Sequence, residues 1–144
     1  SKGVLYEQLP VGQKLDIDEV IFATGGNVGN AAVTFARQGL HARFMWCLGT
    51  DMASESILHD MDKEGVDTSA VLQQDDFRAS YSVILMLEGG ERTILNYKGT
   101  ITPEDTKKLD LSEIEKADWV YVSSLNDIEM LERIVSHAAA HGVK

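Results

Sequence analysis

The residues best suited to bind a polar ligand lie in a glycine-rich turn with the sequence Thr24-Gly25-Gly26-Asn27-Val28-Gly29-Asn30. Gly25 and Gly26 allow the backbone to adopt positive φ and to approach a ligand without a Cβ in the way. Asn27 and Asn30 add amide donors and acceptors. The first backbone N–H groups of a helix have no intrahelical partner, so they too are open to a hydroxyl or an anion. The turn therefore predicts a binding site for a polar small molecule.

A helix is expected to follow the turn and to hold it in place. Apolar residues recur at helical spacing behind the turn, at Val28, Ala31, Ala32, Phe35 and Ala36. A glycine, at position 39, then gives a typical helix end. One face of this helix is expected in the core, with the turn at its N-terminus.

Strands and helices alternate along the rest of the chain, which predicts an α/β fold on a largely parallel sheet. Half-exposed alternation predicts a strand at 14–18, and apolar runs predict buried strands at 42–48, 70–72 and 119–122. A hairpin is expected from strands at 81–87 and 92–97, the first of them deeply buried. Helices are expected at 55–64 and 128–141, with shorter helical turns starting near 102 and 112. Ligands of such folds bind at the carboxyl ends of the strands, where Ser124 lies.

Composition narrows the class of partner. A chain of 144 residues with 44% hydrophobic and 25% charged residues is expected to form one globular domain. The net charge of −10 argues against nucleic acid or an anionic membrane as partner. The single cysteine, Cys47, lies in an apolar run and excludes a disulfide framework, which fits a cytoplasmic location. No apolar stretch is long enough to cross a bilayer.

Four motifs, in this order, resemble those of the ribokinase-like, or PfkB, family of carbohydrate kinases. They are Gly25–Ala31, Gly49-Thr50-Asp51, Glu64–Thr68 and Arg92–Gly99. The Gly-Gly-Asn-x-x-Asn spelling is most similar to the ketohexokinase branch. The resemblance implies a truncated three-layer α/β/α sandwich with a small β-sheet lid. Residues 4–22 and part of 80–98 would form or adjoin the lid, and 23–79 and 99–144 the α/β body.

The resemblance also implies which residues bind the substrate. The glycines and asparagines of the turn would bind sugar hydroxyls, two residues of the hairpin would lie near the substrate or its developing phosphate, and one serine would lie close to a further contact. These residues are Gly25, Gly26, Asn27 and Asn30, then Arg92 and Asn96, then Ser124. One departure is Ser54, because the family usually has glycine three residues after the aspartate of Gly-x-Asp.

ATP and Mg²⁺ are the cofactors that the resemblance implies for a longer parent protein. The catalytic aspartate of the Gly-Ala-Gly-Asp motif and the nucleotide site are expected beyond Lys144, because the chain stops where another strand should begin. No catalytic residue is therefore expected in this chain. The function predicted is the sugar-binding part of an ATP-dependent kinase that phosphorylates a hydroxyl of a small carbohydrate, inactive alone.

Two alternatives remain open at this point. One is a non-catalytic polyol-binding or oligomerisation module, since the free edges of a lid invite a homodimer. The other is a nucleoside kinase of the same fold. His137 and His141 stand four residues apart on the last helix and could form half a metal site. No third ligand is evident from the sequence, so we expect solvated histidines and no metal.

Overall fold

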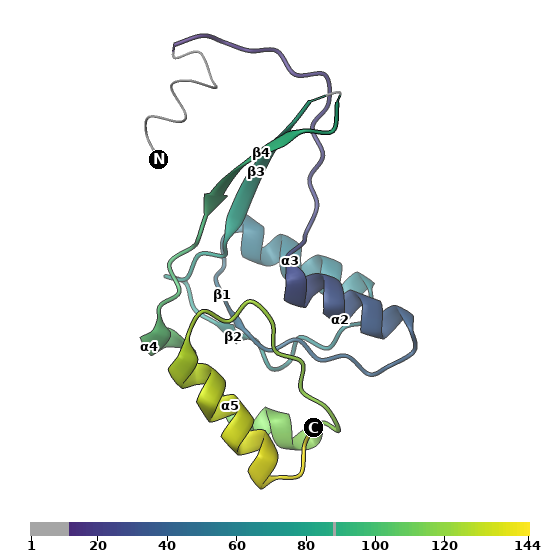
Figure 1. The fold of residues 1–144 in the computed structure, drawn as a ribbon, viewed down its shortest axis with the longest axis vertical. Coiled ribbons are helices and arrows are strands. Elements are labelled where there is room, and N and C mark those ends of the chain that lie inside the picture. Colours follow the sequence, from purple (N-terminus) through teal and green to yellow (C-terminus); the bar gives the residue numbers. More distant parts are fainter. Residues whose placement is uncertain (1–11, 88) are drawn as a thin grey trace.

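The computed structural model describes residues 12–87 and 89–144, so residues 4–11 of the expected lid segment lie outside the described residues. Its helices and strands follow one another along the chain as expected for an α/β protein (Figure 1). They are α2 (Asn27–Arg37), β1 (Cys47–Leu48), α3 (Met52–Lys63), β2 (Leu72–Gln73), β3 (Tyr81–Met86), β4 (Arg92–Tyr97), α4 (Pro103–Thr106), the 3₁₀ helix η1 (Leu111–Lys116) and α5 (Ile128–Ala140).

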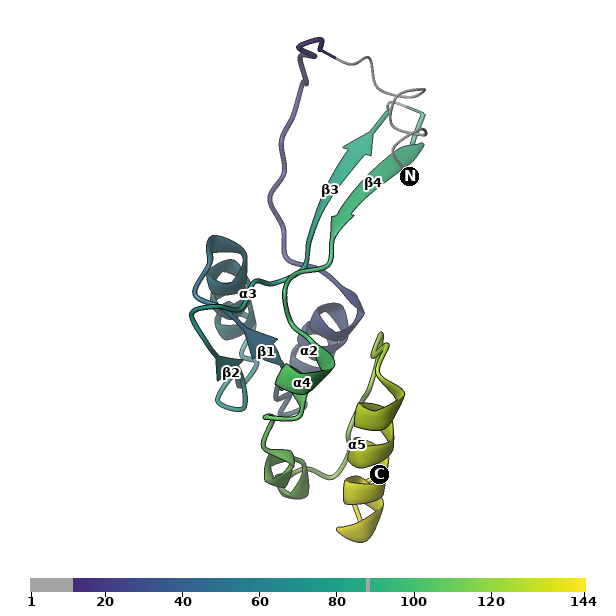
Figure 2. The same cartoon turned by 90° about the vertical axis from the view of Figure 1, so that its left-hand side faces the viewer.

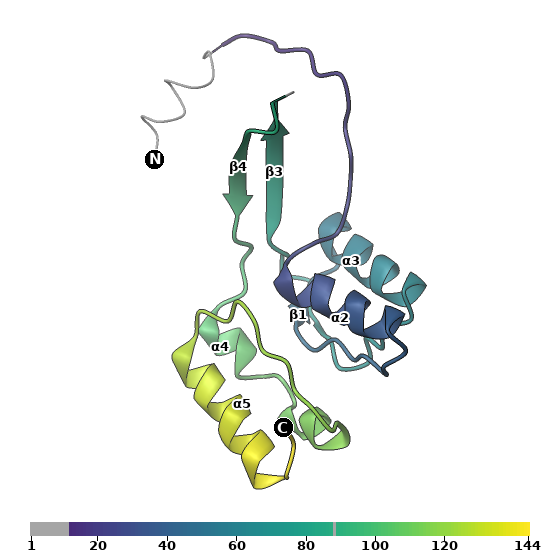
Figure 3. The same ribbon diagram turned by 45° about the vertical axis from the view of Figure 1, so that its right-hand side comes forward.

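The body has three layers. Strands β1 and β2 pair in parallel, and an isolated parallel bridge between Arg43 and Asp67 extends the contact. Helices α2 and α3 lie to one side of these strands, and α4 and α5 lie to the other (Figure 3). This is the α/β/α arrangement that the resemblance to the PfkB family implies.

Alternating side chains in the segment that leads into β1 pack against the helices on both sides of the strands. Met45 and Cys47 face the cluster beneath α5, whereas Phe44 and Leu48 face the cluster beneath α2 and α3. Successive side chains of a strand point to opposite faces, so one buried segment supplies apolar residues to two cores. Burial raises the pKa of the Cys47 thiol to about 11. The expected buried free thiol is confirmed.

The expected strand at 119–122 does not pair with another strand among the described residues, yet its side chains alternate as in a strand. Val120 and Val122 pack in the cluster beneath α5, and the Tyr121 ring meets Phe35 of α2 edge-on, at 5.7 Å between centroids. The Val120 N–H donates to the Lys144 carbonyl over 2.8 Å. The segment is thus extended between two layers with little hydrogen-bonded pairing.

The prediction of a buried strand at 119–122 is wrong for Trp119. Its side chain is 72% exposed, and the Lys144 ammonium lies 5.2 Å from its ring centroid. An apolar run indicates where a strand should lie, but burial of each residue depends on the elements that cover it.

Strands β3 and β4 form the predicted hairpin, with Tyr81 opposite Tyr97 and Met86 opposite Arg92. The hairpin projects away from the helices of the body (Figure 2). Burial of its first strand was predicted wrongly, because Ile84 is 51% exposed and Met86 70%. Within the described residues no further strand pairs with this hairpin, so both of its outer edges remain unpaired.

The half-exposed strand predicted at 14–18 is likewise not formed. Leu15 and Ile17 are 54% and 67% exposed in a segment without strand pairing. Alternation alone does not make a strand, because the backbone groups need a neighbouring strand to pair with.

Helix ends follow the sequence closely. Helix α2 ends before Gly39, which has φ +85°, and α3 ends before Gly65, with φ +73°. Thr102 and Asp105 form a capping box at α4, and the Asp127 carboxylate accepts from the Met130 N–H at the start of α5. None of the described helices is long and apolar enough to cross a membrane.

Candidate functional site

The glycine-rich turn presents the open N-terminus of α2. Gly26 occupies the N-cap position with φ +86°, in the left-handed region that favours glycine. Its carbonyl accepts the Asn30 N–H over 2.9 Å, and within the described residues no side chain caps this helix. A Cβ at Gly25 would meet nothing within 4 Å. The first turn of α2 therefore has backbone donors directed toward open space.

Two of the predicted substrate-binding residues meet at this turn. The Asn27 carboxamide donates from Nδ2 to Ser124 Oγ over 2.7 Å, although 97 positions separate them in the chain. Ser124 has φ +56°, which is unusual for a residue other than glycine. Backbone strain of this kind clusters at ligand sites.

Packing along α2 explains why these two residues meet. Phe35 contacts Tyr121 and Asn27 contacts Ser124. Eight helical residues span about 12 Å, and three extended residues span about 10 Å. The distance from Phe35 to Asn27 along α2 is thus close to the distance from Tyr121 to Ser124 along the extended segment. The segment therefore runs alongside the helix and places Ser124 at the helix N-terminus.

Gly25 and Asn30 line a groove between α2 and α3 with a volume of about 450 Å³. The groove is bordered by a hydrogen bond from Thr24 Oγ1 to Asp60 Oδ2, of 2.9 Å, and farther along by an ion pair between Arg37 and Glu64. The Arg37 guanidinium makes two hydrogen bonds with Glu64, which lower the pKa of that carboxyl. Of the two asparagines, the structure thus places one beside this groove and the other against Ser124.

The two predicted residues of the hairpin lie at different places on β4. Asn96 accepts a hydrogen bond from Ser82 Oγ over 3.0 Å, across the hairpin. Arg92 begins β4 at the end next to the hairpin turn, opposite Met86. Asn96 lies four positions after Arg92, about 13 Å along the strand. No contact among the described residues brings either of them to Asn27 or Ser124.

Ser54, the departure from the family pattern, forms the hydrogen bonds that close the Gly49-Thr50-Asp51 turn. Its hydroxyl accepts from the Gly49 N–H over 2.9 Å and donates to Asp51 Oδ1 over 2.5 Å. Gln73 Nε2 donates to the Gly49 carbonyl over 3.0 Å, which ties the turn to β2. Ser54 is fully buried. The sequence therefore identified an unusual residue without revealing its role, which is to satisfy a buried N–H.

The histidines at the end of α5 have a third neighbour that the sequence did not reveal. Glu115 of η1 approaches both His137 and His141, so a third group with a metal-binding atom lies beside the two histidines. Glu115 is 22 residues before His137. No local pattern indicates such a contact, because packing of η1 against α5 creates it.

Comparison with known proteins agrees with this fold. The profile of the family described as "pfkB family carbohydrate kinase" matches residues 5–143. The ribokinase of Staphylococcus aureus (strain COL) is 31% identical over 136 residues, which cover 92% of this chain and 44% of that protein. The chain thus spans less than half of the length of this relative.

Solved structures give the same picture. The chain titled "Crystal Structure of Sa239" superposes with a TM-score of 0.75 and 30% identity, over 92% of this chain and 45% of that one. A fructokinase with bound ATP from Xylella fastidiosa has a TM-score of 0.71, covers 92% of this chain and 44% of its own, and shares the fold at 21% identity. Because the family match runs over nearly the whole chain and agrees with the fold, the chain belongs to the pfkB family of carbohydrate kinases.

Proposed function

We propose that this chain is the acceptor-binding part of an ATP-dependent sugar kinase that phosphorylates a hydroxyl of a small carbohydrate. The hydrogen bond between Asn27 and Ser124 carries the proposal, because it assembles polar groups at the N-terminus of α2 from two distant parts of the chain. Family membership supports kinase chemistry for the whole protein.

The free atoms of this pair complement a diol. Asn27 uses one N–H of its carboxamide on Ser124, which leaves its carbonyl oxygen as acceptor and its second N–H as donor. The Ser124 hydroxyl accepts in this contact and can still donate its own proton. A sugar hydroxyl both donates and accepts, so two neighbouring hydroxyls match this set. Both side chains are exposed and therefore accessible to a ligand.

In the proposed enzyme these residues position the acceptor rather than react with it. The open N–H groups of α2 and the Asn27–Ser124 pair would fix the sugar so that one hydroxyl faces the phosphoryl donor. Gly25, Gly26 and Asn30 would line the same entrance. We propose that Arg92 and Asn96 reach the substrate when the hairpin lies over it, as lid residues.

The residues at hand do not fit Mg²⁺ or the nucleotide. In the described ranges one group of three side chains could hold a metal, and it contains two imidazoles, whereas Mg²⁺ takes oxygen ligands. The sequence also contains no Gly-Ala-Gly-Asp motif. In our proposal ATP supplies the transferred phosphoryl group and is bound, with Mg²⁺, by residues outside this chain.

Sugar binding by the full-length protein tests the proposal. Ribose and fructose are the first acceptors to titrate, because the similar proteins are a ribokinase and a fructokinase. Asn27→Ala and Ser124→Ala should each weaken sugar binding about fivefold, as expected for a hydrogen bond worth roughly 1 kcal/mol. The loss of sugar affinity in the double variant should be smaller than the product of the two single losses, since the residues act as a pair.

Nucleotide affinity should stay unchanged in all three variants. Gln38→Ala, at the opposite end of α2, is the control and should bind sugar normally. Sugar affinities that are equal in the wild type and in the double variant would remove this turn from the acceptor site.

We further propose that the hairpin β3–β4 belongs to a lid and that the lid pairs two copies of the protein. The exposed apolar residues Val83 and Ile84 on β3 support this, because open strand edges and faces favour pairing with another chain. Ile84→Lys should convert a dimer of the full-length protein to a monomer in light scattering. A wild-type protein that is monomeric at all concentrations would exclude the homodimer.

A further inference from the structure

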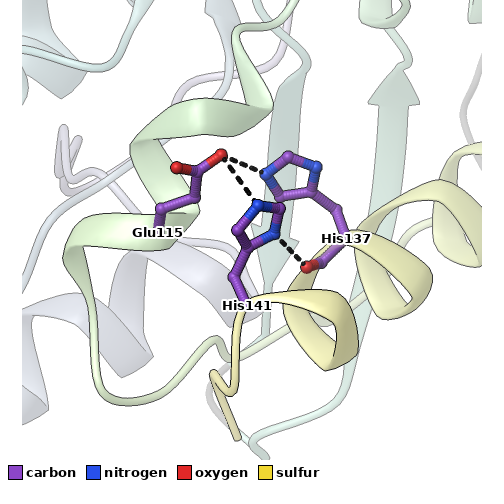
Figure 4. A group of neighbouring side chains, drawn as sticks. All are labelled: Glu115, His137 and His141. Carbon is purple, nitrogen blue, oxygen red and sulfur yellow. Dashed lines mark hydrogen bonds and ion pairs between the residues drawn. The ribbon is translucent and has the colours of Figure 1, made fainter.

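Three side chains with metal-binding atoms meet where η1 packs against α5. Figure 4 shows Glu115 directed toward both His137 and His141. Glu115 Oε1 lies 2.9 Å from His137 Nε2 and 3.5 Å from His141 Nε2. The three ligand atoms all lie within 4.8 Å of one another. This cluster plays no part in the proposed acceptor site.

Hydrogen bonding of His141 determines which of its ring nitrogens is free. His141 Nδ1 lies 2.9 Å from the main-chain carbonyl oxygen of His137. A carbonyl can only accept, so Nδ1 carries the proton. In the neutral ring Nε2 then has a lone pair, and it faces the Glu115 carboxylate across 3.5 Å. Two electron-rich atoms in this arrangement repel each other, and either a proton or a metal cation between them removes the repulsion.

The spacing of the ligand atoms matches a small tetrahedral ion. Ligand atoms about 2.0–2.1 Å from a tetrahedral Zn²⁺ lie about 3.3 Å from one another. The observed separations of 2.9 and 3.5 Å from Glu115 Oε1 bracket this value. The Nδ1 contact of His141 with a carbonyl is also the second contact that zinc-bound histidines usually make, since it fixes the tautomer and orients the ring.

The electrostatic surroundings favour a cation as well. His137 lies in the last turn of α5 and His141 is the C-cap residue, and at this end of a helix the dipole attracts positive charge. The chain as a whole carries a net charge of −10. The side chains of His137, His141 and Glu115 are 25%, 42% and 40% exposed, so a dissolved ion can reach them.

We propose that Glu115, His137 and His141 form a three-ligand site for a divalent transition-metal cation, with Zn²⁺ the best match. Two imidazoles and one carboxylate suit Zn²⁺ and disfavour Mg²⁺ and Ca²⁺, which take oxygen ligands. Water would complete the coordination at the exposed side of the cluster.

The role of this site is to crosslink η1 to α5 through the bound metal. Helix α5 has 13 residues, about 20 Å from end to end. Ser124 precedes its first turn and the histidines lie at its C-terminal end, so the cluster lies far from the acceptor site. A metal that binds only the folded state stabilises it. The proposal is therefore independent of the proposed kinase function.

Titration of the metal-free, untagged full-length protein with ZnCl₂ tests the site. Calorimetry should show that one Zn²⁺ binds per chain. Glu115→Gln and His141→Gln should abolish this binding or weaken the affinity at least about tenfold, because even groups that only hydrogen-bond to metal ligands contribute that much. The Tm of the wild type should rise when ZnCl₂ is added and should return to its metal-free value when a chelator is added. The Tm of both variants should rise less than that of the wild type at the same ZnCl₂ concentration, and MgCl₂ should not replace ZnCl₂.

A matched control is His59→Gln, which removes an exposed histidine from α3 and should leave zinc binding intact. Glu115 and His141 are exposed enough for substitution without unfolding, so the test does not depend on the more buried His137. Equal zinc binding by the wild type and both variants, or no binding by the wild type at micromolar ZnCl₂, would overturn the proposal. Sugar binding is measured separately, so either proposal can fail alone.

Discussion

A buried hydrogen bond joins the main-chain N–H of Gly49 to the hydroxyl of Ser54, over 2.9 Å. The same hydroxyl donates to Asp51, so one side chain satisfies a backbone donor and orients a carboxylate. The family pattern places glycine at this position. Here serine at position 54 makes two hydrogen bonds that close the turn between β1 and α3.

Removal of this hydroxyl should destabilise the protein. Ser54→Ala leaves the Gly49 N–H buried without its partner, which costs about 1–3 kcal/mol. Ser56→Ala is the matched control, because Ser56 is an exposed serine on the same helix and alanine favours helices. Urea denaturation of both variants measures the difference. Equal midpoints for the two would show that the Ser54 hydroxyl does not hold the turn.

Gly49 itself should tolerate no larger residue. A Cβ at this position would lie 2.0 Å from the Phe77 carbonyl oxygen, and backbone cannot move aside as a flexible side chain can. We expect Gly49→Ala to cost at least about 3 kcal/mol, the upper range for overpacking. Gly89→Ala, where a Cβ meets nothing within 4 Å, should leave the thermal midpoint almost unchanged. A folded Gly49→Ala protein of wild-type stability would contradict this geometry.

Asn30 offers a second test of the acceptor site that does not involve the Asn27–Ser124 pair. In the full-length protein, Asn30→Ala should weaken sugar binding and leave nucleotide affinity unchanged, because the exposed carboxamide lines the groove beside the open end of α2. Folding should not suffer, since alanine is the better helix former. Calorimetric titration gives both affinities, and an unchanged sugar affinity would exclude Asn30 from the site.

Acid should weaken the protein between about pH 4 and pH 2. Hydrogen bonds from Lys108 and Thr102 hold the pKa of Asp105 at about 2, below its usual 3.8. Hydrogen bonds from Ser69 and Arg43 do the same for Asp67. A carboxyl with a lowered pKa in the folded state contributes stability above its unfolded pKa and loses it as pH falls through the folded pKa.

The variants Asp67→Asn and Asp105→Asn should therefore show a shallower loss of stability over this pH window. Chemical denaturation at a series of pH values measures the slope. Asp16→Asn, in the exposed segment before the glycine-rich turn, is the control and should keep the wild-type slope. If stability fell with pH equally steeply in the wild type and all variants, solvent screening would have cancelled the contribution of these exposed hydrogen bonds.

Local features of the fold could be predicted from the sequence because they depend on neighbouring residues. The left-handed Gly39 after α2, the capping box at Thr102 and the Asp127 cap of α5 each need only a few consecutive residues. The hairpin could be predicted as well, because its two apolar runs flank a glycine turn.

Burial and distant contacts could not be predicted, because they depend on which elements cover a segment. The residues of β3 are apolar enough for a core, yet in the described residues the hairpin projects from the body. Trp119 is exposed for the same reason. A single sequence shows that a residue is apolar and does not show what lies over it.

The sequence by itself determined the open glycine-rich turn, the asparagines beside it and the family to which they point. Only the tertiary structure decided that Ser124 meets Asn27 and that Glu115 meets His137. Both contacts join segments far apart in the chain, through packing along α2 in one case and of η1 against α5 in the other. Periodicity describes one element at a time, whereas a site requires the placement of several.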